Sequence, residues 1–181
     1  MTAIYLLRHG EPDFTRVREL NWPGPAVDLA PLSDLGIQQA LDAADGLAHV
    51  GATALVASPM TRALQTASLV GHRLGLRVDV RFDLREWLPD EKACWTSYAE
   101  VKEALSDLER CDGEWPPGER RGWEPLSDVR ARATAALRSQ IASAGLGNDD
   151  VLIAACHGIV IWSLTGERHT GLAQWRRFDL T

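Results

Sequence analysis

The sequence is poor in cysteine and has no long apolar run, and each absence excludes a class of protein. Its three cysteines, Cys94, Cys111 and Cys156, are too few and too irregularly spaced for a disulfide framework, and no C-x-x-C pair suggests a zinc site. No window approaches the roughly 20 apolar residues that cross a bilayer, and no lysine-rich leader precedes an apolar run. We therefore expect reduced thiols, no metal or other cofactor, no membrane partner and a cytoplasmic location.

Positive charge is also scarce. The chain has 19 lysines and arginines against 25 acidic residues, for a net charge of -6, which argues against a nucleic-acid partner. Any anionic ligand must be held by local positive charge. Hydrophobic residues at 45% and charged residues at 24% are typical of a globular protein, and 181 residues suit one domain over 1–181. The sequence leaves the oligomeric state open.

Short apolar runs alternate with amphipathic segments along most of the chain. The runs at 3–7, 52–57 and 151–156 lack polar alternation, as strands covered on both faces do, whereas 76–82 and 174–180 alternate like edge strands. Between them, three segments have helical spacing and end signals. This order predicts an α/β fold, a three-layer α/β/α sandwich with a mainly parallel central sheet.

The three predicted helices have recognisable ends. The first opens at Ser33 and should bury one face, made by Ile37, Ala40, Leu41, Ala44 and Leu47. The second is expected to open with Ser58 as N-cap and Pro59 at its first position, and to stop at Gly75. The third is expected to run from Ser127 to Gly145.

Residues 87–125 break this pattern. The segment is rich in proline and holds four tryptophans, with one expected helix near 98–108. We interpret it as a lid-like insertion. Its tryptophans could line a substrate pocket or form a small satellite core.

Cationic side chains and imidazoles stand where three predicted strands end. Arg8 and His9 end the first strand, His157 follows the last buried run and is followed by Gly158, and Arg62 lies just after the second. In open α/β sheets, sites form beyond the carboxyl ends of strands. A neutral imidazole is a good nucleophile toward phosphorus, and guanidinium groups clamp phosphate oxygens. This combination predicts phosphoryl transfer.

A proton donor for the leaving oxygen is also needed. Glu86, in L-R-E-W after the first alternating segment, is the candidate, because a carboxyl beside Trp87 could be desolvated and kept protonated. The alternative interpretation is an ion-pair partner of Arg85 or Arg81.

Four motifs in order, L-L-R-H-G-E, S-P-M-T-R-A-L-Q-T-A, L-R-E-W and A-C-H-G, together with D-L-A-P-L-S-D-L-G-I-Q-Q-A at 28–40, resemble the histidine phosphatase superfamily, the phosphoglycerate-mutase-like proteins. The resemblance spans most of the chain. It implies that His9 is the phosphorylated nucleophile, that Arg8 and Arg62 bind the phosphoryl group, and that His157, with Gly158 beside it, completes the phosphate pocket. Glu86 falls where many members place their acid and base.

The sequence departs from the family pattern in two places. Thr15 stands near a polar residue that often touches the phosphate, but the surrounding E-P-D-F-T-R differs from the mutases. The family's G-E-S before its third long helix is here W-E-P-L-S, with Ser127 as a polar position that is kept.

The function predicted is a metal-independent phosphatase that hydrolyses a small phosphorylated substrate through a phosphohistidine. Three alternatives remain: a phosphoglycerate-type phosphomutase, a phosphohistidine-protein phosphatase and a non-catalytic phosphate-binding module. The short chain favours a phosphatase over a mutase, and Glu86 counts against the protein phosphatase, whose members lack an acid there. Retention of His9 and the two arginines counts against a non-catalytic module.

Overall fold

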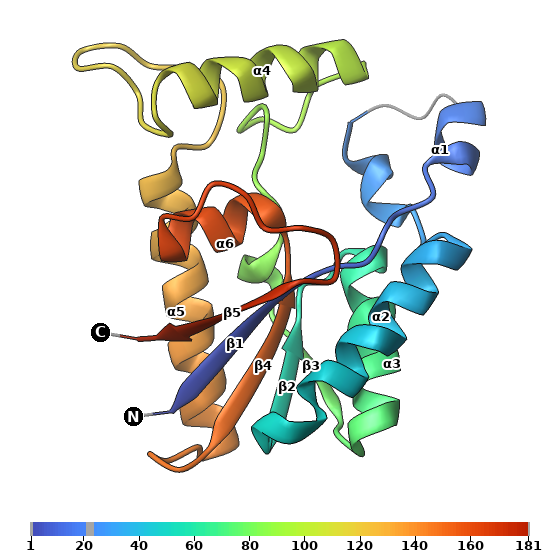
Figure 1. Cartoon of the computed structure of the whole chain (residues 1–181). Coiled ribbons are helices and arrows are strands. Elements are labelled where there is room, and N and C mark those ends of the chain that lie inside the picture. Colours follow the sequence, from blue (N-terminus) through green and yellow to red (C-terminus); the bar gives the residue numbers. More distant parts are fainter. Residues whose placement is uncertain (1, 21–23, 181) are drawn as a thin grey trace.

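The computed structural model of the chain describes residues 2–20 and 24–180 (Figure 1). Within these ranges five strands form one sheet, in the spatial order β3-β2-β4-β1-β5. The strands are β1 (Ala3–Arg8), β2 (Ala54–Ala57), β3 (Val78–Val80), β4 (Val151–Cys156) and β5 (Trp175–Asp179). All neighbouring pairs are parallel except β1 with β5. The mainly parallel sheet, with the alternating segments at its edges, is as the sequence predicts.

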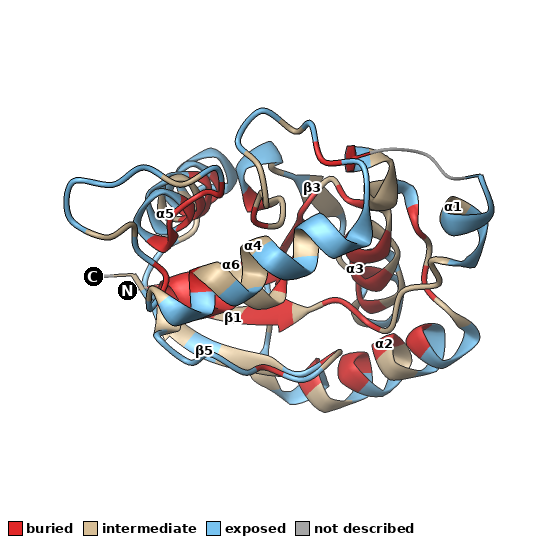
Figure 2. Ribbon diagram, turned by 90° about the horizontal axis from the view of Figure 1, so that it is seen from above, coloured by how far each residue is buried: buried red, intermediate tan, exposed pale blue. Residues whose placement is uncertain are grey.

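Helices cover both faces of this sheet (Figures 1 and 2). The outer layers consist of α2 (Asp34–Leu47) and α3 (Thr61–Leu74) on one side, and α5 (Leu126–Ala144) and α6 (Gly158–Thr165) on the other. Side chains of β1 contribute to the cores on both faces of the sheet. Ile4 and Leu6 pack toward α5 and α6, whereas Leu7 packs toward α2 and α3. The predicted three-layer α/β/α sandwich is therefore confirmed.

Short elements complete the described chain. They are α1 (Thr15–Glu19), α4 (Tyr98–Arg110) and the 3-10 helices η1 (Gly24–Leu29), η2 (Ala48–Val50) and η3 (Phe82–Leu84). No helix in the described ranges is both long and apolar enough to span a bilayer.

The start of α2 is as predicted, and Ala40, Ala44 and Leu47 of its predicted face are buried, but Ile37 is not. Ser33 is the N-cap, and its hydroxyl accepts a hydrogen bond from the amide of Gly36 at 3.0 Å. Ile37, expected to point inward, is exposed. The first turn instead approaches the chain after β1 through Gly36, where a Cβ would overlap the carbonyl oxygen of Glu11. This close approach turns the neighbouring Ile37 outward.

The start of α3 was predicted wrongly. The helix begins at Thr61 with Met60 at the N-cap position, so neither Ser58 nor Pro59 opens it. The hydroxyl of Ser58 is engaged by a histidine, as described below. The predicted end is confirmed, since Gly75 terminates the helix in the left-handed conformation at φ +70°.

The segment 87–125 contains α4, close to its predicted place. This helix lies beyond the carboxyl ends of the strands, over α6 (Figures 1 and 2), and Leu108 is its one buried residue. Trp87 and Trp123 are buried in the same core as α5 and α6, and Trp115 packs against it. These three tryptophans therefore belong to the main core and do not form a separate satellite core.

Candidate active site

Three neighbouring strands are followed by polar residues, of which His9 and His157 were predicted site residues and Ser58 was a predicted helix cap. His9 follows β1, Ser58 follows β2 and His157 follows β4, and these strands are adjacent and parallel. Both imidazoles are buried, with ring centroids 5.2 Å apart and planes inclined by 60°. The sheet thus brings together two histidines that are far apart in sequence.

Hydrogen bonds assign the tautomer of His9. Its Nδ1 lies 2.7 Å from the backbone oxygen of Gly10, and because a carbonyl only accepts, Nδ1 carries the proton. Its Nε2 lies 3.3 Å from Nε of Arg62, which donates to it. Gly10 is itself fixed, since its amide donates to the hydroxyl of Thr66 at 3.1 Å. The lone pair of His9 is therefore held on Nε2, beside an arginine.

Burial and positive neighbours keep His9 neutral. Desolvation is the largest cause that lowers its pKa from 6.5 to about 3, and Arg62 is the second. The pKa of His157 is also lowered well below its usual value, by burial first and then by Arg62. Both rings are therefore uncharged at neutral pH, so Nε2 of His9 carries a lone pair rather than a proton.

His157 is oriented by a residue that sequence reasoning assigned differently. Its Nε2 lies 2.7 Å from the hydroxyl of Ser58, and the same hydroxyl accepts from the amide of Met60 at 3.3 Å. Ser58 is fully buried. The residue expected to cap α3 is therefore a positioning group for the second histidine. The position of Ser58 directly after a buried strand is the sequence feature that could have indicated this role.

Two arginines border the imidazoles and carry unused hydrogen-bonding capacity. Arg8, which ends β1, donates from Nη1 to the backbone oxygen of Thr170 at 2.6 Å. Nε of Arg8, Nη1 of Arg62 and Nδ1 of His157 are buried and have no hydrogen-bond partner within the described chain. Buried polar atoms are nearly always paired. Three such atoms in one cluster suit an anion with several oxygens, such as a phosphoryl group.

Gly158 and Thr170 shape the surroundings of Arg8. A Cβ at position 158 would lie 3.4 Å from Nε and Cζ of Arg8, at van der Waals contact, so the guanidinium lies directly against the start of α6. Thr170 is buried, and its hydroxyl is another atom for which the described residues offer no partner. It comes from the loop before β5, and no motif marked it.

A carboxylate that the sequence did not single out also reaches the site. Asp28, on η1, lies 3.7 Å from Nη1 of Arg62 and is partly exposed. Burial raises the pKa of Asp28, and Arg62 opposes that rise. Because Arg62 is buried, this carboxylate partly balances its charge. Only the folding of the segment around η1 brings Asp28 close to Arg62.

Glu86 lies beyond β3 and η3, and its side chain is partly buried. Its carboxylate accepts from the backbone amide of Trp87 at 2.9 Å, and its own amide contacts Sδ of Met60 at 3.4 Å. Desolvation raises the pKa of Glu86 against opposing contributions from the Trp87 amide, Arg62 and Arg8. A raised pKa favours the protonated carboxyl that a proton donor requires. Arg85 forms ion pairs with Asp83 and Glu124.

Two polar residues matched in the sequence lie at the surface. Thr15 is exposed at the start of α1, and its amide donates to Asp13 at 2.8 Å. Ser127 is exposed and donates to the carboxylate of Glu114 at 2.8 Å. Within the described chain no hydrogen bond or ion pair links either residue to His9, so a phosphate contact by Thr15 stays a prediction.

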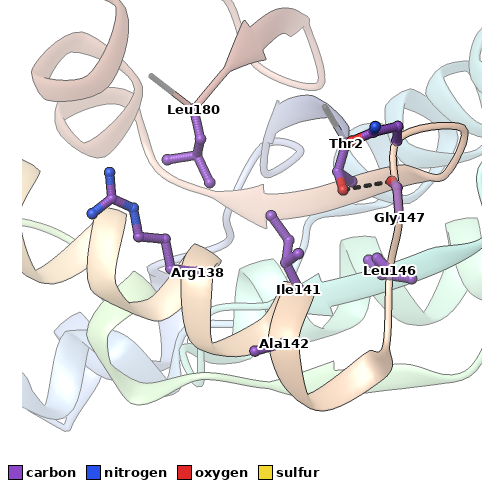
Figure 3. A pocket seen from close by; sticks show the side chains of 8 residues that line it. Thr2, Arg138, Ile141, Ala142, Leu146, Gly147 and Leu180 are labelled. Carbon is purple, nitrogen blue, oxygen red and sulfur yellow. Dashed lines mark hydrogen bonds between the residues drawn. The ribbon is translucent and has the colours of Figure 1, made fainter.

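Other features of the described chain lie outside this cluster. In the described ranges, no group of three or more histidine, cysteine, aspartate or glutamate side chains could hold a metal ion. A mainly apolar cavity of about 330 Å³ lies beside the amino-terminal ends of β1 and β4 and the carboxyl end of β5 (Figure 3). There Thr2 donates to the carbonyl of Gly147 at 2.8 Å, beside Ile141 and Leu180. None of the predicted site residues lines this cavity.

Residues 4–181 match the histidine phosphatase superfamily (branch 1). The chain belongs to this superfamily. The predicted family is thus confirmed over nearly the whole length of this histidine phosphatase, including the strand ends that bear His9 and His157.

Its relatives include phosphatases and mutases. A glucosyl-3-phosphoglycerate phosphatase of Mycolicibacterium vanbaalenii is 30% identical over 90% of this chain and 72% of its own length. A probable phosphoglycerate mutase of Salmonella typhi is 29% identical, but over only 48% of this chain and 38% of its own. A mycobacterial glucosyl-3-phosphoglycerate phosphatase solved with VO3 superposes with a TM-score of 0.72 at 26% identity, covering 98% of this chain and 90% of that one.

The lowered pKa of His9 predicts how the stability of this histidine phosphatase changes with pH. The pKa of His9 is lower in the folded state than in the unfolded state, so the neutral ring contributes fully to the free energy of unfolding above about pH 6.5. This contribution is lost as pH falls toward 3. Between about pH 7 and about pH 5, the wild type should therefore lose about 2 kcal/mol more unfolding free energy than the His9→Gln variant. Urea unfolding at both pH values measures this. The exposed His49, changed to glutamine, should follow the wild type; equal losses in all three proteins would contradict it.

Proposed function

We propose that this protein is a metal-independent phosphatase that hydrolyses phosphomonoesters through a phosphohistidine at His9. The observation that carries the proposal is the neutral His9, whose Nε2 lone pair is held 3.3 Å from Arg62 in a buried cluster with unpartnered polar atoms. Neutral imidazole nitrogen is the nucleophile that this transfer needs. The cytoplasmic location expected from the sequence agrees with three unpaired cysteines.

In the first step, Nε2 of His9 attacks phosphorus as the bond from phosphorus to the ester oxygen breaks. The proton of the Glu86 carboxyl passes to the leaving oxygen, which departs as a neutral alcohol. Arg8 and Arg62 bind the phosphoryl oxygens and balance the charge that spreads over them. Neutral His157, aligned by Ser58, donates a hydrogen bond from Nδ1 to the same oxygens.

In the second step, water attacks the phosphorus of the phosphohistidine. The Glu86 carboxylate takes a proton from that water, and the bond between Nε2 and phosphorus breaks. Inorganic phosphate is the product, and both His9 and the protonated Glu86 are regenerated. No step needs a metal ion.

Hydrolysis rather than mutase activity is favoured by how the relatives match. The glucosyl-3-phosphoglycerate phosphatase aligns with 90% of this chain, whereas the mutase aligns with 48%. Phosphorylated glycerate esters are therefore the first substrate class to examine. The presence of Glu86, with a raised pKa, separates the proposal from a phosphohistidine-protein phosphatase, for which a proton donor is unnecessary.

A panel of phosphorylated metabolites, with glucosyl-3-phosphoglycerate and 3-phosphoglycerate among them, tests the proposal. We expect release of inorganic phosphate, no isomerised phosphoglycerate, and activity that EDTA leaves unchanged. Phosphate is measured colorimetrically and isomers by chromatography. A strict metal requirement, or isomerisation without phosphate release, would contradict the proposal.

A further inference from the structure

The guanidinium of Arg132, on α5, holds the backbone that carries Glu86. Its Nη1 donates to the carbonyl oxygens of Asp83 at 2.7 Å and Arg85 at 2.8 Å, and its Nη2 donates to that of Glu86 at 3.2 Å. Its Nε and Nη2 also donate to the two carboxylate oxygens of Glu124, at 2.6 and 3.0 Å. These bonds use every N–H group that a guanidinium possesses. The Arg132 side chain is only 11% exposed.

Glu124 holds the same segment from its other end. One oxygen of its carboxylate accepts from the amide of Leu88 at 3.3 Å, and the other accepts from Nη2 of Arg85 at 3.4 Å. Its backbone oxygen accepts the indole N–H of Trp87 at 2.6 Å, and its amide donates to the carbonyl of Leu88 at 3.0 Å. Glu124 is buried, so its charge depends for compensation on Arg132, at 2.6 Å, and on the more distant Arg85.

Glu86 therefore depends on this pair for its place. It lies after η3 in a stretch without helix or strand, so no regular hydrogen-bond ladder fixes its backbone. The residues before it are held through carbonyl oxygens by Arg132, and those after it by Glu124. A planar guanidinium with a fixed fork sets directions as well as distances, which a lysine ammonium cannot do.

We propose that Arg132 and Glu124 form a positioning pair that places the Glu86 carboxyl for proton transfer to the leaving oxygen. The proposal rests on the proposed function, in which Glu86 is the acid and base. Arg132 acts through the backbone of the 83–88 segment and does not touch the substrate. Small displacements of a reacting group cost large factors in rate, so loosening this segment should slow the step that uses the Glu86 proton.

Leaving-group dependence separates positioning from mere stability. Arg132→Lys keeps the charge and loses the fork. With a folded variant, we expect kcat/KM on an alkyl phosphate to fall about 10- to 100-fold and that on 4-nitrophenyl phosphate to change less than about threefold, because nitrophenolate needs little protonation. Equal losses on the two substrates would overturn the proposal. Arg130→Lys is the matched control, since Arg130, on the same helix, donates instead to the carbonyl of Ser163. It should show no leaving-group dependence.

A double-mutant cycle tests whether Arg132 acts through Glu86. In a Glu86→Gln background, Arg132→Lys should cause no further loss that depends on the leaving group. A full additional loss on the alkyl phosphate would overturn the proposal. Glu124→Gln, which keeps the shape of the side chain, provides a second variant if Arg132→Lys does not fold. It should reproduce the dependence.

The two proposals can fail separately. If the wild type forms no phosphohistidine, the proposed function fails. If the wild type does form it, and Glu86→Gln shows leaving-group dependence while Arg132→Lys and Glu124→Gln do not, only the positioning pair fails.

Discussion

Replacing His9 with alanine should lower phosphate release from any phosphomonoester by about four orders of magnitude or more, because the variant has no nitrogen to accept the phosphoryl group. The expected loss is in kcat and is the same for activated and unactivated esters. Steady-state kinetics on 4-nitrophenyl phosphate and on an alkyl phosphate measures it.

The fold should survive this change. His9 lies at the end of β1, and the register of β1 with β4 and β5 is set by backbone hydrogen bonds that alanine leaves in place. Circular dichroism and a thermal melt check this. His72→Ala is the matched control, since His72 is exposed in the last turn of α3 and should leave turnover unchanged. Undiminished turnover in a folded His9→Ala protein would refute the nucleophile.

Replacing Glu86 with glutamine should lower kcat/KM on alkyl phosphates by about 100- to 1000-fold and kcat/KM on 4-nitrophenyl phosphate by less than about tenfold, because kcat/KM does not include the later hydrolysis of the phosphohistidine. Glutamine keeps the side-chain shape but cannot donate the proton, so the penalty grows with the basicity of the leaving oxygen. Kinetics on a series of esters of increasing alcohol pKa gives the dependence directly.

The pH profile gives a second test of Glu86. Because desolvation raises the pKa of this carboxyl, wild-type activity on alkyl esters should fall as pH rises through that pKa, and the Glu86→Gln variant should lose this dependence. Glu11→Gln is the control, since the Glu11 carboxylate accepts from Ser33 and should affect both ester types alike. A Glu86→Gln variant that is impaired equally on both ester types would remove Glu86 from the acid role.

The sequence predicts the parts of this molecule that follow from local pattern. Unbroken apolar runs mark β1 and β4, and histidines directly after them must lie at one edge of a parallel sheet. A glycine after a helical segment favours the left-handed conformation that ends a helix, so the ends of α3 at Gly75 and α5 at Gly145 follow from the sequence. These features predict that His9, His157 and Arg62 lie together.

What the sequence could not supply depends on packing between distant segments. Ser58 has the sequence of a helix cap, yet its hydroxyl serves His157, and α3 starts later. Asp28 opens the family-like 28–40 motif and Arg132 lies in the middle of a helix, but nothing in the sequence indicates that Asp28 lies near Arg62 or that Arg132 binds the Glu86 backbone. Ile37 fits a helical stripe, but contact of Gly36 with the preceding chain decides which face turns inward. Each was settled by a partner that spacing alone does not reveal.

Direct detection of the intermediate tests the central claim. Glu86→Gln should slow hydrolysis of the phosphohistidine more than its formation from 4-nitrophenyl phosphate, so the phosphorylated enzyme should accumulate. After an alkaline quench, which preserves phosphohistidine, mass spectrometry of the peptide that contains His9 should locate the phosphoryl group on its imidazole. Phosphate release with no phosphorylated His9, or a phosphoryl group on any other residue, would contradict the mechanism.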